Sequence, residues 1–129
     1  MEKFAHMALL ADFYGPLLTE KQRKIWELHY DQDFSLGEIA EAERISRQAV
    51  HDLIKRTEKI LCGYEEKLGL AGRFLQEREK LLAVTKRLQR FEAKDFRDEG
   101  LWLRYLEVKA KIEDIYQGIA GDSPNGLLD

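Results

Sequence analysis

Two serines and a group of basic and amide side chains make residues 35–55 the most informative segment of the chain. Ser35 stands three residues before Glu38, the spacing of a capping box, and Ser46 can cap a second helix. The first turns of this second helix carry side chains that can bond to base edges or contact phosphates. The nucleic-acid-binding face expected from them consists of Arg47, Gln48, His51, Lys55, Arg56 and Lys59.

Apolar side chains at helical spacing predict how this face is presented. In the first helix they form one edge, and in the second they recur at i, i+3 and i+4, so both helices can pack on one core. These residues are Leu36, Ile39, Ala40, Val50, Leu53 and Ile54. The arrangement is a helix-turn-helix, whose second helix can enter a major groove with its N-terminal end. There Arg47 and Gln48 would read base edges, and the cations behind them would hold phosphates. The same face could instead dock a protein.

The composition of the 129-residue chain predicts an all-α protein. Its hydrophobic fraction of 44% suffices for a core, and proline occurs only at Pro16 and Pro124. Valine is scarce, while residues that favour helices, such as leucine, alanine, glutamate and lysine, are abundant. No segment has the roughly 18 apolar residues of a membrane helix, and no secretion signal is recognisable. Together these features predict a cytoplasmic protein that makes no membrane contact.

The charge balance argues against strong binding of nucleic acid by an isolated monomer. The net charge is −3, and residues 19–68 contain nine Lys/Arg against eleven Asp/Glu. Dedicated DNA-binding domains are usually basic, because neutralised phosphates supply most of the non-specific affinity. The stretch from Ser46 to Leu61 is more favourable, since it holds four Lys/Arg against two Asp/Glu. DNA, RNA and protein therefore all stay open as partners.

Capping and glycine signals divide the chain into two parts. Helices are expected over residues 2–14 and 19–30, before the helix-turn-helix, whose second helix runs on to Leu68. Gly69 and Gly72 then predict a break. The predicted organisation is a helix-turn-helix domain over residues 1–70, a helical hairpin over 71–121 that turns around 95–100 and is terminated by Gly118 and Gly121, and a flexible tail over 122–129.

An apolar stripe in the second half of the hairpin follows 4-3-4-3-4 spacing, which is typical of helix-packing seams. Its members are Leu101, Tyr105, Val108, Ile112, Ile115 and Ile119. The stripe can pack within the chain or against a second subunit, and the two are compatible. Because neighbouring apolar residues such as Trp102 widen it beyond one seam, we expect a homodimer whose interface includes Leu101, Tyr105, Val108, Ile112 and Ile115.

The remaining reactive residue types predict neither a metal site nor a cofactor site. The three histidines share no i, i+3 or i+4 spacing with one another or with Cys62. Cys62 is the only cysteine, follows an apolar helix face, and is expected to be a buried, inert thiol. Trp26, Tyr30 and Phe34 could stack on bases, but core packing is the favoured interpretation. No glycine-rich phosphate loop is present. An enzyme is therefore not expected.

Four runs, Leu18–Arg23, Leu28–Tyr30, Ser35–Ala40 and Ile45–Val50, resemble region 4 of bacterial sigma factors, a four-helix domain whose last helix reads promoter DNA. Asp12–Tyr14, Leu17–Gln22, Ser46–Val50 and Tyr64–Leu68 resemble more closely the YlxM family of small proteins similar to that region. The resemblance covers about residues 4–70. It implies a DNA-binding-type regulatory protein, linked by gene neighbourhood to the signal recognition particle. It also allows an adaptor that binds the particle's GTPase or its RNA.

The turn of the motif departs from the sigma pattern. Leucine and glycine usually precede the Ile-Ser pair, but Glu43 and Arg44 stand there in this chain. Glycine suits the left-handed conformation of such a turn, and a side chain there costs roughly 1–2 kcal/mol. Glu43 is also expected to lose an apolar contact. The sequence therefore leaves the shape of the turn, and with it the angle of the second helix, undecided.

Overall fold

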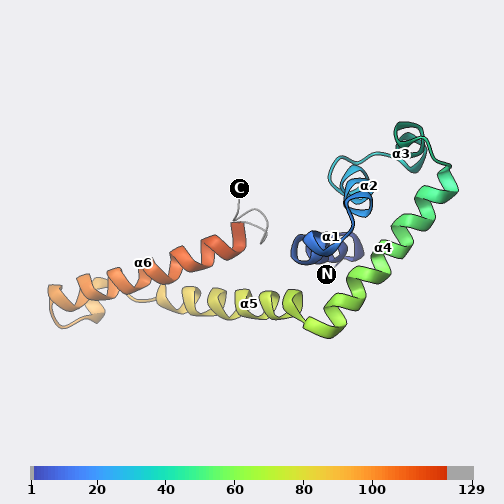
Figure 1. Ribbon diagram of the computed structural model, residues 1–129. Helices are drawn as coiled ribbons and strands as arrows, with labels where there is room; N and C mark the ends of the chain where they lie inside the picture. The colour runs from blue at the N-terminus through green and yellow to red at the C-terminus, as the bar shows by residue number, and fades with distance from the viewer. Residues whose placement is uncertain (1, 122–129) are drawn as a thin grey trace. The chain divides into compact units, whose positions relative to one another are not determined.

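The computed structural model describes residues 2–121 and divides into two units, Met1–Ala71 and Gly72–Asp129. Within the described residues all regular structure is helical, which confirms the all-α prediction (Figure 1). None of the described helices is long and apolar enough to cross a membrane. The predicted tail over 122–129 lies outside the described residues. The helices are α1 (Lys3–Tyr14), α2 (Glu20–Tyr30), α3 (Leu36–Glu43), α4 (Arg47–Leu68), α5 (Leu70–Leu88) and α6 (Glu99–Gly121), with short 3-10 turns η1 (Gly15–Leu17) and η2 (Ala93–Asp95).

Side-chain caps define where the helices of the first unit begin. The Thr19 hydroxyl accepts a hydrogen bond from the backbone N–H of Gln22 at 3.2 Å, and the Gln22 side chain accepts one from the N–H of Thr19. Ser35 and Glu38 form the same reciprocal pair at the start of α3. The capping box predicted from Ser35 and Glu38 is therefore confirmed, and Thr19 with Gln22 forms a second one. Each satisfies backbone donors that the first turn of a helix would otherwise leave without a partner.

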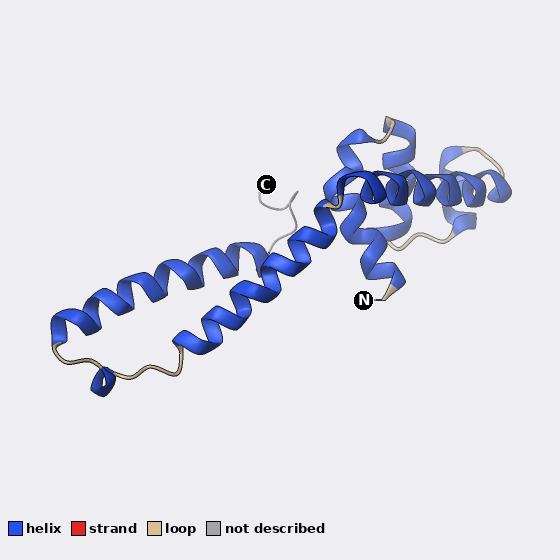
Figure 2. Cartoon of the chain, turned by 90° about the horizontal axis from the view of Figure 1, so that it is seen from below, coloured by secondary structure: helices blue, strands red, loops and turns tan. Residues whose placement is uncertain are grey.

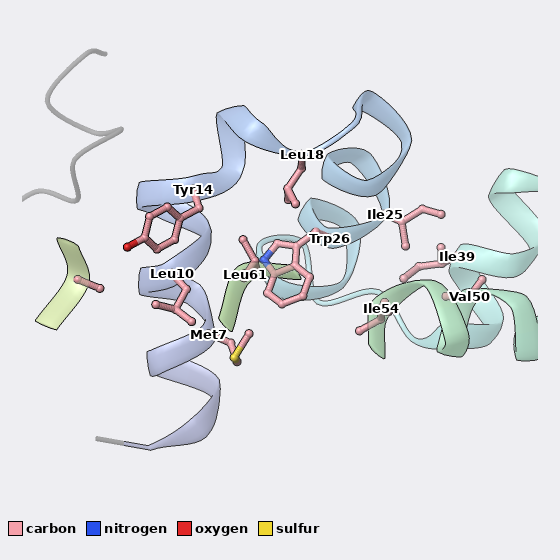
Figure 3. Packing of buried hydrophobic residues seen from close by; sticks show 11 residues of the cluster. Met7, Leu10, Tyr14, Leu18, Ile25, Trp26, Ile39, Val50, Ile54 and Leu61 are labelled. Carbon is pink, nitrogen blue, oxygen red and sulfur yellow. The ribbon is translucent and has the colours of Figure 1, made fainter. Parts of the chain in front are cut away.

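The core of the first unit is built from α1 to α4 and has Trp26 near its middle (Figure 3). Met7 and Leu10 of α1 lie on one side of the indole, near Leu61 of α4. On the other side, the start of α4 packs against α2 and α3. The largest side chains that are less than 2% exposed are Tyr14, Leu10, Ile25, Ile39, Leu61, Val50 and Thr57. Helix α4 contributes along most of its length, so it is both the scaffold of the core and the carrier of the predicted binding face.

Hydrogen bonds of Tyr14, Glu65 and Gly69 form a joint where α4 ends and α5 begins. Gly69 ends α4 in the left-handed conformation, with φ of 63°, and donates its N–H to the carbonyl of Glu65. The Tyr14 hydroxyl donates to Glu65 Oε1 at 2.5 Å and accepts from the N–H of Leu70 at 3.1 Å. Glu65 Oε1 also accepts from the N–H of Ala71 at 3.0 Å. Two donors in the first turn of α5 are thus satisfied by side chains from α1 and α4.

The second unit is a hairpin of α5 and α6, which run antiparallel (Figure 2). Near the connection, Tyr105 donates its hydroxyl to the carbonyl of Leu88 and contacts Phe91, Phe96 and Trp102 at ring-centroid distances of 5.0–5.5 Å. No side chain described in α6 is fully buried. Aromatic contacts at the connecting end therefore hold a hairpin that encloses little dry core.

Three glycines predicted to mark breaks or turns lie inside helices instead. Gly72 belongs to α5, while Gly100 and Gly118 belong to α6. A single glycine in a helix costs only about 1 kcal/mol relative to alanine, so flanking helix formers override it. Gly69 differs because its backbone has a positive φ, and there the helix does end.

Candidate nucleic-acid interface

Helices α3 and α4 and the turn between them have the arrangement of a helix-turn-helix. Ile39 of α3 and Val50 of α4 are both 0% exposed and belong to the same core cluster, which holds the two helices together. The Ser46 hydroxyl accepts a hydrogen bond from the N–H of Ala49 at 3.0 Å, so α4 begins where the sequence predicts. The N-terminal turns of α4 are therefore presented on a fixed scaffold.

The turn keeps its left-handed residue even though glycine is absent. Arg44 has φ of 57° and ψ of 43°, and the N–H of Ile45 bonds to the carbonyl of Ala40 at 3.1 Å. The side chain of Glu43 is only 19% exposed and lies 3.4 Å from the ammonium of Lys24 on α2. An ion pair with a neighbouring helix thus replaces the apolar contact that Glu43 was expected to forfeit.

We expect Arg44→Gly to stabilise the first unit by about 0.5–1 kcal/mol. Relief of the left-handed strain contributes roughly 1–2 kcal/mol, and the larger backbone entropy of glycine in the unfolded chain takes part of that back. Urea denaturation should show a higher midpoint with an unchanged slope. Arg44→Ala is the control, because it removes the same side chain without relieving the strain. Equal midpoints for the two variants would contradict a strained turn.

The predicted binding residues lie together on the outer face of α4. All six side chains are exposed, and they occupy the first four turns of the helix: Arg47, Gln48, His51, Lys55, Arg56 and Lys59. Asp52 stands among them. It accepts a hydrogen bond from Gln48 Nε2 at 2.9 Å, and its carboxylate lies 3.6 Å from His51 Nδ1. Gln48, whose amide is suited to recognise adenine, is therefore already hydrogen-bonded to a carboxylate of its own helix.

Glu58 gives the face a second internal acceptor. Its carboxylate lies 3.7 Å from the Lys55 ammonium and 3.8 Å from that of Lys3 on α1, and its own side chain is 15% exposed. Tyr30 donates its hydroxyl to Glu58 at 3.1 Å, and burial together with this carboxylate raises the pKa of Tyr30 to about 12. The phenol therefore stays a donor at neutral pH. Sequence reasoning missed the contributions of Lys3 and Tyr30, since no local spacing connects them with α4.

Structural roles account for the aromatic residues of this unit. Trp26 is 3% exposed and stacks on Tyr30 with ring centroids 4.1 Å apart. Phe34 is half-buried against the same core cluster. The core interpretation of these rings is therefore confirmed. Of the side chains described, the indole N–H of Trp26 is the only buried polar atom without a hydrogen-bond partner.

The prediction of a buried Cys62 is wrong, because the thiol is exposed. Its neighbour Leu61 takes the core position at 0% exposed, and the next residue of a helix points about 100° away. Cys62 consequently lies beyond Lys55 and Lys59 on the outer side of α4.

Among residues 2–121, no three His, Cys, Asp or Glu side chains are grouped closely enough to hold a metal ion.

The residues of the expected dimer interface differ in exposure. Val108 and Ile115 are 57% and 51% exposed, whereas Leu101, Tyr105 and Ile112 are half-buried. Tyr105 is engaged in the aromatic contacts within the hairpin. Only part of the heptad stripe is thus available on the surface of one chain.

Residues 1–99 of the sequence match a family model described as "Putative helix-turn-helix protein, YlxM / p13 like", UPF0122. The chain belongs to this family. A UPF0122 protein of Desulforamulus reducens is 50% identical over 93 residues, which cover 72% of this chain and 80% of the relative. One from Thermoanaerobacter sp. is 43% identical over 114 residues, covering 88% and 97%. One from Bacillus cereus is 56% identical over 88 residues, covering 68% and 79%.

The family match confirms the predicted kinship with YlxM proteins and extends it. The resemblance was expected to end near residue 70, but the model reaches residue 99 and so takes in α5 and the connection to α6. The Thermoanaerobacter relative aligns over nearly its whole length. Helix α5 and the connection that follows it are therefore part of what the family model covers, whereas α6 after Glu99 lies beyond its end.

Proposed function

We propose that the chain is a non-catalytic, DNA-binding-type regulatory protein whose α4 enters the major groove. The observation that carries the proposal is the exposed cluster of Arg47, Gln48, His51, Lys55, Arg56 and Lys59 on the first four turns of a helix locked by a helix-turn-helix core. Arg47 reads a base edge, and the lysines and Arg56 contact phosphates. Action in or near the signal recognition particle pathway is supported only by the resemblance to the YlxM family.

The acceptors within the face support a second candidate. Asp52 engages Gln48 and Glu58 engages Lys55, so two carboxylates lie among the side chains that would face DNA. A partner surface that brings its own cations or hydrogen-bond donors could pair with these carboxylates, whereas the phosphates of DNA are repelled by them. On this alternative the chain is an adaptor that docks the particle's GTPase or its RNA through α4.

Two substitutions on α4 test the DNA-binding proposal. Arg47→Ala removes a bidentate base contact worth roughly 1–3 kcal/mol and should reduce sequence preference. Lys55→Ala removes a phosphate contact, so it should weaken all duplexes similarly and lower the salt slope by about one. Fluorescence anisotropy with labelled duplexes at several salt concentrations measures both effects. Fluorescein attached to Cys62, the only cysteine and an exposed one, gives a local signal beside the face.

The control is Lys80→Ala, which removes one exposed cation from α5 and should leave duplex affinity unchanged. Neither α4 substitution should alter the melting temperature, since both side chains are exposed. Duplex binding that is absent even at low salt would overturn the DNA proposal. If capture of the purified particle protein or RNA is then lost in the same variants, the adaptor is the correct alternative.

We also propose that the protein is a homodimer. The support is the exposure of Leu103, Val108 and Ile115 on α6, a helix with no fully buried side chain among its described residues. A second copy that covers Val108 and Ile115 would complete the heptad stripe. Light scattering at tens of micromolar protein should give twice the mass of one chain. The double variant Val108→Lys with Ile115→Lys should give the mass of one chain. A monomeric wild type would contradict the proposal.

A further inference from the structure

Basic side chains gather at the connecting end of the hairpin, just ahead of Asp98 and Glu99. Residues 86–97, called the tip here, contain five Lys/Arg and two Asp/Glu in a chain of net charge −3. Ser46 to Leu61 holds four Lys/Arg against two Asp/Glu in a longer stretch. The cations of the tip are Lys86, Arg87, Arg90, Lys94 and Arg97. An acidic protein that gathers this charge at one turn favours an anionic partner there.

A hollow of about 410 Å³ opens at the tip and is lined by Arg87, Arg90, Phe91 and Asp95. Its volume falls in the range of sites that hold one small organic group. Among the described residues, neither guanidinium lies within 4.0 Å of a carboxylate, whereas Lys94 pairs with Glu92 at 3.1 Å. Asp95 is held in place, because one of its oxygens accepts the N–H of Glu92 at 2.8 Å. The hollow therefore combines two available cations with one fixed carboxylate.

Phe91 supplies an aromatic wall. It is 49% exposed, and its ring is backed by Tyr105 at 5.5 Å and by Phe96 at 6.0 Å. Trp102 stacks on Tyr105 with ring centroids 5.4 Å apart and so extends the cluster. A ring that is held by neighbours on one side and exposed on the other can stack on a second flat ring and lose little conformational entropy.

We propose that this hollow binds one unpaired nucleotide of a single-stranded nucleic acid. The base stacks on Phe91, and the adjoining phosphates are held by Arg87 and Arg90, whose planar guanidinium groups suit phosphate oxygens. The Asp95 carboxylate accepts a hydrogen bond from an amino group of the base, which a plain phosphate does not offer. A duplex is a poor ligand, because its bases are already stacked and paired. RNA and single-stranded DNA share the chemistry that the hollow recognises.

The test measures anisotropy of a labelled 12-nucleotide RNA, a DNA of the same sequence and the matching duplex with the full chain. Phe91→Leu keeps an apolar side chain but removes the stacking surface, so single-strand affinity should fall about tenfold. Arg87→Gln with Arg90→Gln should lower the single-strand salt slope by about 1.4. The fluorescence of Trp102 should change when the wild type binds the single strand, because the cluster links it to Phe91.

The matched control is Lys80→Gln with Lys111→Gln, which removes two exposed cations from the same hairpin away from the hollow. It should leave single-strand affinity within twofold of the wild type. Arg47→Ala should also leave the affinity for single strands unchanged. The test of the hollow is therefore independent of whether α4 binds duplex DNA. Tighter binding of either single strand than of duplex, lost in the tip variants, supports the site. Binding unaffected by Phe91→Leu, or weakened equally by the control, would overturn it.

Discussion

Leu61→Ala is expected to lower the free energy of unfolding of the first unit by about 2–5 kcal/mol. Leu61 is 0% exposed and packs near Trp26 and Leu10, so the truncated side chain leaves a cavity as well as losing buried apolar surface (Figure 3). A unit of this size has a total stability on the order of 4–11 kcal/mol. The substitution therefore removes a large share of what holds α4 against α1 and α2.

Cys62→Ala provides a matched control one residue away. The thiol is exposed, so its removal should change the free energy of unfolding by less than about 0.5 kcal/mol. Urea denaturation can follow the first unit alone through Trp26 if Trp102, the only other tryptophan, is replaced by phenylalanine in every variant. Similar losses for the two alanine variants would show that the core does not lie on the Leu61 side of α4.

One face of α4 packs in the core and the other carries the predicted ligands, so Leu61→Ala should also affect binding. The exposed face of its first four turns carries the predicted ligands, while Val50, Ile54 and Leu61 anchor the opposite face in the core. Loss of the anchor near the middle of the helix should loosen its start as well. We therefore expect Leu61→Ala to weaken any ligand bound by α4, although Leu61 touches none.

Local signals made much of this fold predictable from sequence. Thr19 with Gln22 and Ser35 with Glu38 form the capping boxes that their spacing indicates, and Ser46 begins α4. Each of these contacts spans three residues, so it depends on the chain alone. The outer face of α4 follows in the same way, because the buried positions of a helix fix the exposed ones.

Contacts between residues that are far apart in the sequence could not be predicted from local sequence patterns. Glu43 was expected to lose an apolar contact, but Lys24, far away in the sequence, pairs with it. The error at Cys62 has the opposite origin, since the apolar face was extended by one position past Leu61. The hollow at the tip likewise depends on how Phe91 meets Tyr105 across a connection, which no spacing rule specifies.

Tyr14→Phe is expected to destabilise the joint between α4 and α5 by about 1–3 kcal/mol. The hydroxyl is buried, donates to Glu65 Oε1 and accepts from the N–H of Leu70. Removal of the hydroxyl thus leaves the N–H of Leu70 without its acceptor, and it takes one of two donors away from Glu65 Oε1, which keeps the N–H of Ala71. Burial and the Glu65 carboxylate both raise the pKa of Tyr14, so the phenol is neutral and donating at physiological pH.

A double-mutant cycle measures how much the contact between Tyr14 and Glu65 contributes to the free energy of unfolding. Glu65→Gln keeps the size of the side chain and an acceptor oxygen but removes the charge, so its loss should be smaller than that of Glu65→Ala. Tyr14→Phe with Glu65→Ala should cost less than the sum of the single variants by about 1–2 kcal/mol, because the first change already breaks the shared contact. Hydrogen exchange at the amides of Leu70 and Ala71 provides an independent measurement, since both donate to this pair of side chains. Strictly additive losses with unchanged exchange at these two amides would mean that Tyr14 stabilises the unit through ring packing alone. In that case α5 would begin without help from α1, and its first turn would depend on Gly69 and water.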